Sequence, residues 1–358
     1  SDRRGSSSGA IRVNWSRTDY RIDSASSAGA KLNTDTPVVT AVANRREAVT
    51  GQLTLEAGAT AAIGAGRAVF GPHLRLQWRL AAPVTASASY DRFHQHQQSL
   101  RNPESVAGAV FPVELNIGAG TAGVPVARSD LAIVAVDARL YPGARVTAQV
   151  YRRSSVGLAL AAPRSADPFS AGDFVVGTGS TTGAAIDASM ATARFVALAS
   201  YGFQYTLLTA EGRRYRPDQG AAHTLDAGVI AFPSATSSVR LGLAVGGGRV
   251  GSESIGDLEW EACNLRDRGC EFGGSPRVDP ATLGRTPLPG YVRLDLGVRR
   301  HWHVRFAGRD ASVALFGTVS NLLGRRNLMA YVTDPRTGER SGIEMRPRGP
   351  LVIGQIGR

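Results

Sequence analysis

The stretch Val292-Arg293-Leu294-Asp295-Leu296-Gly297-Val298-Arg299 decides the fold class, because its apolar residues alternate with polar or small ones without exception. A β-strand places successive side chains on opposite faces of its sheet, so this pattern predicts a strand with one apolar and one polar face. No segment of helical period competes. The same reading predicts further strands at 11–16, 74–79, 84–90, 132–140, 145–151, 183–190, 195–205, 223–232, 238–245 and 311–321.

The connections between these strands alternate in length from residue 80 onward. Pro and Gly mark most of the short turns, as tight reversals require. Outer-membrane barrels have short turns at one end and long loops at the other, so the fold class is all-β, an antiparallel transmembrane β-barrel with 13 or 14 strands in this chain. The short turns are expected at 81–83, 142–144, 191–193, 233–237 and 304–310, and the long connections at 92–129, 157–173, 208–220, 250–289 and 322–345.

The start of the chain follows this rhythm less clearly. Residues 21–46 are interpreted as a long polar segment, and residues 47–64 as one strand or two. Residues 1–358 are expected to form one barrel portion without a plug domain.

Composition excludes two classes of protein. The longest apolar run, 131–136, is far shorter than the roughly 18 residues of a membrane helix, so a helical membrane protein is excluded. The net charge is +12, but Lys31 is the only lysine and the arginines are scattered through the chain. This distribution argues against a basic nucleic-acid-binding arm.

In a membrane barrel the polar face of each strand lines the lumen. A basic lumen could select anionic solutes, or its arginines could simply pair with lumenal acids and with lipopolysaccharide phosphates at the rim. The lumen-facing arginines are predicted to be Arg75, Arg79, Arg139, Arg145, Arg240, Arg293 and Arg299.

Aromatic residues gather at the ends of the predicted strands. Amphipathic rings prefer the membrane interface, although aromatics also close off strands in other β proteins. The interface aromatics are predicted to be Trp78, Tyr90, Tyr141, Tyr291 and Trp302.

Two cysteines, Cys263 and Cys270, are separated by six residues within a polar, Gly-rich stretch. This spacing favours a disulfide over two free thiols, and a zinc site is a weaker alternative. The long connection that holds them, 250–289, is the best candidate for ligand contact, because a disulfide lowers the cost of ordering an exposed loop.

Catalytic and metal-binding motifs are not evident. His301 and His303 share one face of a predicted strand, and His94 and His96 open a long loop, but a solvated rim explains both pairs better than metal binding. The nucleophile elbow, zinc-protease, P-loop and dinucleotide-binding patterns are missing, so the chain is expected not to be an enzyme and to need no cofactor.

Four segments carry a resemblance to a known family: FGPHLRLQWRLAAPVTASASYDRFHQ (70–95), LPGYVRLDLGVRRHW (288–302), ASVALFGTVSNLLGRRN (311–327) and IEMRPRGPLVIG (343–354). The first resembles a mid-barrel hairpin of TonB-dependent outer-membrane receptors. The others, in this order, resemble that family's C-terminal end. The resemblance departs at the last strand, which ends Gln355-Ile356-Gly357-Arg358 without the family's terminal aromatic residue.

The resemblance implies energised uptake of a scarce nutrient, such as a metal chelate, a vitamin or a glycan. It implies a barrel of roughly 22 strands, of which this chain supplies the C-terminal part. The implied location is the cell outer membrane, with long loops extracellular and short turns periplasmic. The implied partners are outer-membrane lipid and lipopolysaccharide, a small-molecule ligand, and a TonB-type energy-transducing protein bound through an N-terminal region. A passive porin, a non-transport scaffold or adhesin, and a soluble β-sandwich or solenoid enzyme remain alternatives.

Overall fold

One antiparallel sheet dominates the computed structural model. It contains 15 strands, of which 14 lie side by side in chain order while β12 pairs with β11 alone. The structure describes residues 5–24, 27–99, 116–120, 123–161, 174–217, 221–255, 277–278, 281–306, 309–334, 337–345 and 349–357. The strands of the sheet are β1 (Ser6–Ser24), β2 (Ser27–Ala48), β3 (Leu53–Gly64), β4 (Arg67–Ala81), β5 (Val84–Gln95), β8 (Ala127–Tyr141), β9 (Ala144–Ala161), β10 (Phe174–Ala191), β11 (Phe195–Ala210), β12 (Arg213–Tyr215), β13 (His223–Ser234), β14 (Ser237–Gly247), β19 (Tyr291–Phe306), β20 (Arg309–Ser320) and β23 (Gly349–Gly357).

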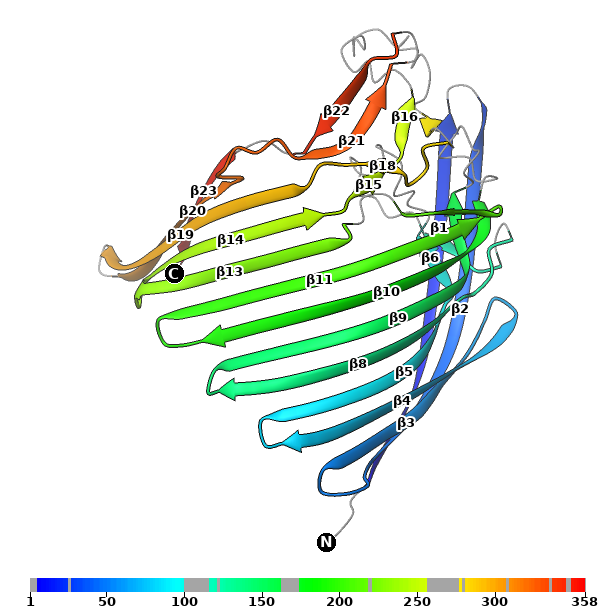
Figure 1. Ribbon diagram of the computed structural model, residues 1–358, viewed down its shortest axis with the longest axis horizontal. Helices are drawn as coiled ribbons and strands as arrows, with labels where there is room; N and C mark the ends of the chain where they lie inside the picture. Colours follow the sequence, from blue (N-terminus) through cyan, green and yellow to red (C-terminus); the bar gives the residue numbers. More distant parts are fainter. Residues whose placement is uncertain are drawn as a thin grey trace.

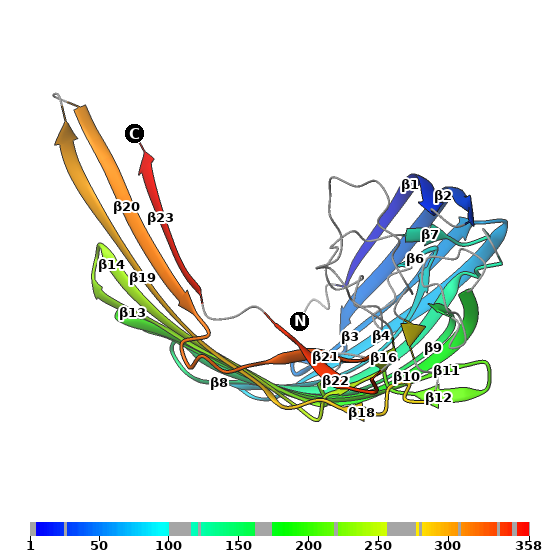
Figure 2. The same cartoon turned by 90° about the horizontal axis from the view of Figure 1, so that it is seen from above.

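The sheet is twisted and curved into a trough (Figures 1 and 2). Its two edges are β1 and β23, which do not pair with each other among the described residues. The prediction of an all-β antiparallel architecture with 13 or 14 strands is confirmed. Over the described part of the chain, this sheet is a curved wall and not a closed barrel.

The alternation of short and long connections is also present. Neighbouring strands are joined at one end of the sheet by turns such as 82–83 and 142–143. Gly143 has a φ of 85°, and a Cβ there would lie 2.3 Å from the carbonyl oxygen of Ala191, so this turn requires glycine. The opposite end holds the short strands β6 (Gln97–Ser99), β7 (Asn116–Gly118), β15 (Val250–Gly251), β16 (Glu253–Ile255), β17 (Arg277–Val278), β18 (Thr286–Pro287), β21 (Leu328–Thr333) and β22 (Arg340–Glu344).

The N-terminal region differs from its interpretation as a polar segment. Residues 21–24 form the end of β1, and residues 27–46 form most of β2, which is 22 residues long. A tight turn at 49–52 then separates β2 from β3, which settles the ambiguity at 47–64 in favour of two strands.

The two faces of the sheet differ in chemistry. On the convex face, large apolar side chains are exposed, among them Trp78 at 53%, Val134 at 56% and Ile186 at 51%. Cross-strand pairs such as Val134 with Val150 continue this apolar surface from strand to strand. A contiguous exposed apolar face of this extent is foreign to soluble monomers and indicates a face that meets an apolar solvent.

The concave face carries the alternate, mostly polar side chains. The β6–β7 hairpin lies within the trough beside β2 (Figure 2), where Thr34, Thr36 and Val38 of β2 are buried. A small apolar cluster of Ala210, Tyr215 and Leu283 packs at the end with the long connections.

Candidate functional site

A continuous row of side chains crosses the concave face from β4 to β19. Each member lies directly opposite the next on the neighbouring strand, and Ala244 is the only apolar residue in the row. We call it the polar row. Its members are Arg79, Thr85, Asp137, Thr147, Asp187, Ser200, Asp226, Ala244 and Arg293.

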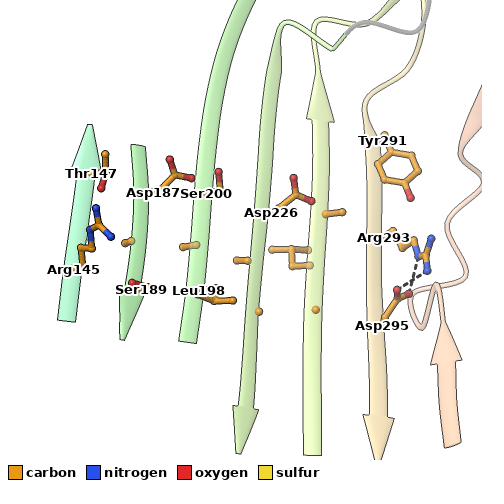
Figure 3. Close-up of a pocket in the computed structure, with 17 residues that line it drawn as sticks. Arg145, Thr147, Asp187, Ser189, Leu198, Ser200, Asp226, Tyr291, Arg293 and Asp295 are labelled. Carbon is orange, nitrogen blue, oxygen red and sulfur yellow. Dashed lines mark hydrogen bonds and ion pairs between the residues drawn. The ribbon is translucent and has the colours of Figure 1, made fainter. Parts of the chain in front are cut away.

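Two hollows adjoin the polar row. The first, of about 690 Å³, is formed by β3, β4, β5, β8 and β9 and is lined by Arg75 and Arg79 among others. The second, of about 870 Å³, lies over β9, β10, β11, β13, β14 and β19 (Figure 3). Arg145 and Thr147 line both hollows, so the two form one corrugated polar surface.

Small residues account for the depth of the second hollow. Gly228 and Gly242 face each other across β13 and β14, and Ser189 and Ser200 line the hollow on the adjacent strands. A Cβ added at Gly242 would meet no atom within 4 Å. The hollow is therefore deep here because the side chains on its floor are short, and this depth leaves room for a bound group.

Ion pairs hold several of the arginines in place. Arg293 donates from Nε to Asp295 Oδ1 at 2.8 Å, and its Nη2 lies 2.6 Å from Oδ2. Asp295 also accepts from the backbone N–H of Asn321 at 2.9 Å. Arg145 pairs in the same way with Asp137, at 2.5 Å from Nε to Oδ2.

Two acids of the second hollow have no such partner. Asp187 and Asp226 flank Ser200 on successive strands and point from the same face as it (Figure 3). Both are exposed, and within the described part of the chain neither makes a hydrogen bond or an ion pair. Both carboxylates of the second hollow are therefore available to bind a donor or a cation.

Charge is unevenly divided between the hollows. Four arginines and three acids line the first, whereas two arginines and three acids line the second. The first hollow is therefore lined by one more arginine than acids, and the second by one more acid than arginines. Arg145 and Arg293 lie beside acids of the wall, so neither hollow is uniformly basic.

The remaining predicted arginines lie on strands of the same wall. Arg139 lies directly opposite Arg145, Arg240 opposite Gly297, and Arg299 opposite Ser238. Alternation places all three on the face that carries Arg145 and Arg293.

Four of the five predicted interface aromatics are exposed on the convex side of the sheet. Tyr141 lies at the short-turn end, where its hydroxyl contacts Met190 Sδ at 3.7 Å. Trp302 lies beneath the guanidinium of Arg300, which is 5.5 Å from the ring centroid. Trp78 is 53% exposed and Tyr90 is 36% exposed.

Tyr291 corrects the prediction, because it lines the second hollow on the concave face. Its neighbour Val292 pairs with Val245 on the apolar face, so alternation gives Tyr291 the orientation of Arg293.

The two cysteines and the histidines of β19 are not part of the described lining of the two hollows. Cys263 and Cys270 lie outside the described residues, as does most of the long connection 250–289. His301 and His303 occupy the face of Arg299 on β19. Among the described residues no three His, Cys, Asp or Glu side chains gather as a metal site. The described part of the chain likewise contains no helix long and apolar enough to cross a membrane.

The sequence reading missed part of this wall. Arg46 and Glu56 line the first hollow, and both lie where the strands were left undefined. Asp187, Ser200 and Asp226 were recognised as strand residues but not as a group, because only the cross-strand register brings them together.

Comparison with known proteins identifies the fold. No protein-family model and no curated protein matches the chain. The structure is similar to the siderophore receptor PirA from Pseudomonas aeruginosa, with a TM-score of 0.55 and 11% sequence identity over 98% of this chain. It is also similar to the ferric yersiniabactin uptake receptor FyuA from Yersinia pestis, with a TM-score of 0.56 and 10% identity over 91% of this chain.

A third similar structure is the ferripyoverdine receptor of the outer membrane of P. aeruginosa bound to ferripyoverdine, with a TM-score of 0.56 and 12% identity over 91% of this chain. The fold is that of an outer-membrane receptor barrel. The chain spans 54% of the PirA chain, 46% of the FyuA chain and 39% of the ferripyoverdine receptor chain. The family resemblance drawn from residues 70–95 and from the C-terminal segments is therefore confirmed at the level of fold.

Proposed function

We propose that the chain forms part of the wall of an outer-membrane receptor that takes up a scarce nutrient with energy from a TonB-type partner. The observation that supports this proposal is the two-faced sheet, with an apolar convex face and a hollowed, charged concave face. A membrane barrel has lipid outside and a polar interior, whereas a soluble sandwich buries its apolar faces between two sheets.

In this proposal the convex face meets lipid and the concave face lines the lumen, so the arginines of the polar row are lumenal. The long connections are extracellular and the short turns periplasmic. The strands are longer than a bilayer requires. A strand of 18 residues, such as β9 or β10, spans roughly 60 Å, about twice the hydrocarbon thickness, so its outer half stands above the membrane.

A metal chelate is the substrate class that the similar structures favour, since PirA is a siderophore receptor and FyuA takes up ferric yersiniabactin. Residues 1–358 form the barrel wall, and the plug domain and the segment that contacts the TonB-type partner are contributed from outside this range. A passive porin or a non-transporting scaffold has the same two-faced wall but needs no energy input.

Uptake measurements separate these functions. Cells carrying the full-length protein and cells lacking it are supplied with a panel of radiolabelled ferric siderophores, vitamins and glycans, with and without a protonophore. The proposal expects accumulation of at least one chelate that depends on the protein and stops when the proton gradient collapses. Uptake that survives the protonophore identifies a porin, and the absence of uptake of every chelate, vitamin and glycan tested identifies a scaffold.

A further inference from the structure

The convex face changes from apolar to basic at one level of β5, β8 and β9. On β8 its residues are apolar from Leu140 back to Ala132, a stretch of nine residues, and then become Asp130 and Arg128. About nine to eleven residues is the length over which a tilted strand crosses the hydrocarbon layer. The charged residues therefore begin where this layer ends, on the side of the long connections.

Three arginines, Arg92, Arg128 and Arg152, lie at this boundary, and the first two share one acid, Asp130. Asp130 accepts from Arg92 Nε at 2.6 Å and from the Tyr90 hydroxyl at 2.6 Å, and its Oδ2 lies 3.3 Å from Arg128 Nε. On the next strand Arg152 is exposed and lies opposite Ala132. Within the described residues Arg152 has no acid partner, so the cluster carries an excess of positive charge.

The geometry leaves donor groups available for an anion. The side chains of Arg92 and Arg128 are 32% and 43% exposed. Arg92 uses Nε toward Asp130 and Nη2 toward the Tyr90 hydroxyl, which leaves its Nη1 to donate elsewhere. Arg128 approaches Asp130 through Nε alone, which leaves both of its Nη groups to donate elsewhere. Arginine binds phosphate oxygens with paired, charge-assisted hydrogen bonds. Tyr90 adds an amphipathic ring below the arginines at the level where lipid headgroups begin.

We propose that Arg92, Arg128 and Arg152 form a binding site for the phosphate groups of a phosphorylated lipid in the outer leaflet. The inference rests on the proposed function, since it needs the convex face to meet lipid with the long connections outside. We name lipid as the ligand for two reasons. The arginines lie directly beyond the lipid-facing apolar surface on the same strands, and their excess positive charge attracts the anionic headgroups at that level of the membrane. The opposite end offers no such cluster among its described residues, where Arg300 stacks on Trp302.

Lipid co-purification tests the site. The full-length protein is extracted from outer membranes in a neutral detergent, and retained lipid A is quantified by its phosphate and hydroxy fatty acids. The triple variant R92Q/R128Q/R152Q is compared with wild type and with R300Q, which removes a convex-face arginine at the other end. We expect roughly a hundredfold weaker retention of lipid A in the triple variant and no change in R300Q, because each arginine near a charged membrane surface strengthens binding about fivefold.

A second arm identifies the source of the phosphate. Delipidated protein is placed in phosphatidylcholine nanodiscs with or without diphosphoryl lipid A, and inorganic phosphate is added separately. Thermal stabilisation by lipid A alone, lost in the triple variant, supports the site, whereas stabilisation by inorganic phosphate as well shows a free-anion site. Equal lipid A retention by wild type and triple variant overturns the proposal. Because chelate uptake is measured separately, its failure would count against the receptor function and not against this site.

Discussion

Asp295 shows how a single side chain is secured on the concave wall. It accepts from Nε of Arg293, lies 2.6 Å from Nη2 of the same side chain, and accepts from the backbone N–H of Asn321, where β20 ends. Asp187 lies on the same wall but has no partner among the described residues. The two acids are therefore a matched pair for separating structural from binding roles.

We expect Asp295→Ala to lower the free energy of unfolding by about 1–3 kcal/mol, because it removes a partly buried charged hydrogen-bond acceptor. Asp187→Ala should change it by less than about 0.5 kcal/mol. Equilibrium urea unfolding in lipid vesicles measures both. Equal losses in the two variants would show that the contacts of Asp295 with Arg293 and Asn321 do not stabilise the wall.

His96 makes one part of the fold sensitive to acid. It is buried just beyond β5, and burial lowers the pKa of its imidazole below the usual value of 6.5. Its Nε2 has no hydrogen-bond partner in the described part of the chain. The carbonyl of His96 accepts from the N–H of Ala119, and Gln98 ties the same hairpin to Gly157.

Since the folded state resists protonation of His96, docking of the β6–β7 hairpin is fully stable above about pH 6.5 and weakens as the pH falls below it. We expect the protection factor of the Ala119 amide, which is the intrinsic exchange rate divided by the measured rate, to fall from pH 7.5 to pH 5. His96→Gln should remove this pH dependence, and His301→Gln should leave it intact. A response that persists in His96→Gln assigns the sensitivity to another group.

At the scale of the element, β8 separates lipid-facing from lumen-facing positions one residue at a time. Val136 lies on the convex face opposite Ala86 and Ala148, near the middle of the apolar stretch. The adjacent Ala135 lines the first hollow. The same side chain introduced at these two positions therefore faces lipid at position 136 and the polar hollow at position 135.

Val136→Arg should cost about 2–4 kcal/mol of folding free energy in lipid, the penalty for arginine at the bilayer midplane. Ala135→Arg should cost far less, because its side chain enters a polar hollow. Folding into vesicles of defined composition measures the difference. Similar costs at both positions would refute the assignment of the two faces.

The same alternation explains how much could be predicted from the sequence. Alternation predicts residues 11–16 of β1 and the long strands of the large sheet from β4 to β20, because lipid on one side and water on the other impose a strict period of two. The alternating pattern disappears in residues 21–46, where polar residues fall at both odd and even positions. The sequence therefore predicts a polar segment there instead of strands.

The site was only partly predictable. Alternation along a strand predicts the face on which each arginine lies. Applied to β19, it also puts Tyr291 on the concave face, because Tyr291 lies two residues before Arg293. It cannot give the neighbours across strands, since these depend on turns and on bulges such as the one between Arg79 and Ala81. Asp187 and Asp226 are distant in sequence and meet only through the register of β11.

At the scale of the whole molecule, the described strands form a curved wall with two open edges, β1 and β23. Within a hydrocarbon layer an unpaired strand edge is too costly to persist, because its N–H and C=O groups have no water to bind. The account therefore requires that both edges pair with further strands in the membrane. The similar receptors, of which this chain spans 39–54%, are long enough to supply such strands in their own barrels.

The central claim is that lipid covers the convex face, and site-directed spin labelling along β8 tests it most directly. Single nitroxide labels at positions 132 to 136 are reconstituted in bilayers, and their collisions with oxygen and with a water-soluble nickel complex are compared. The account predicts high oxygen accessibility at 132, 134 and 136, and high nickel accessibility at 133 and 135. Uniform accessibility along the strand, or the opposite phase, would contradict it.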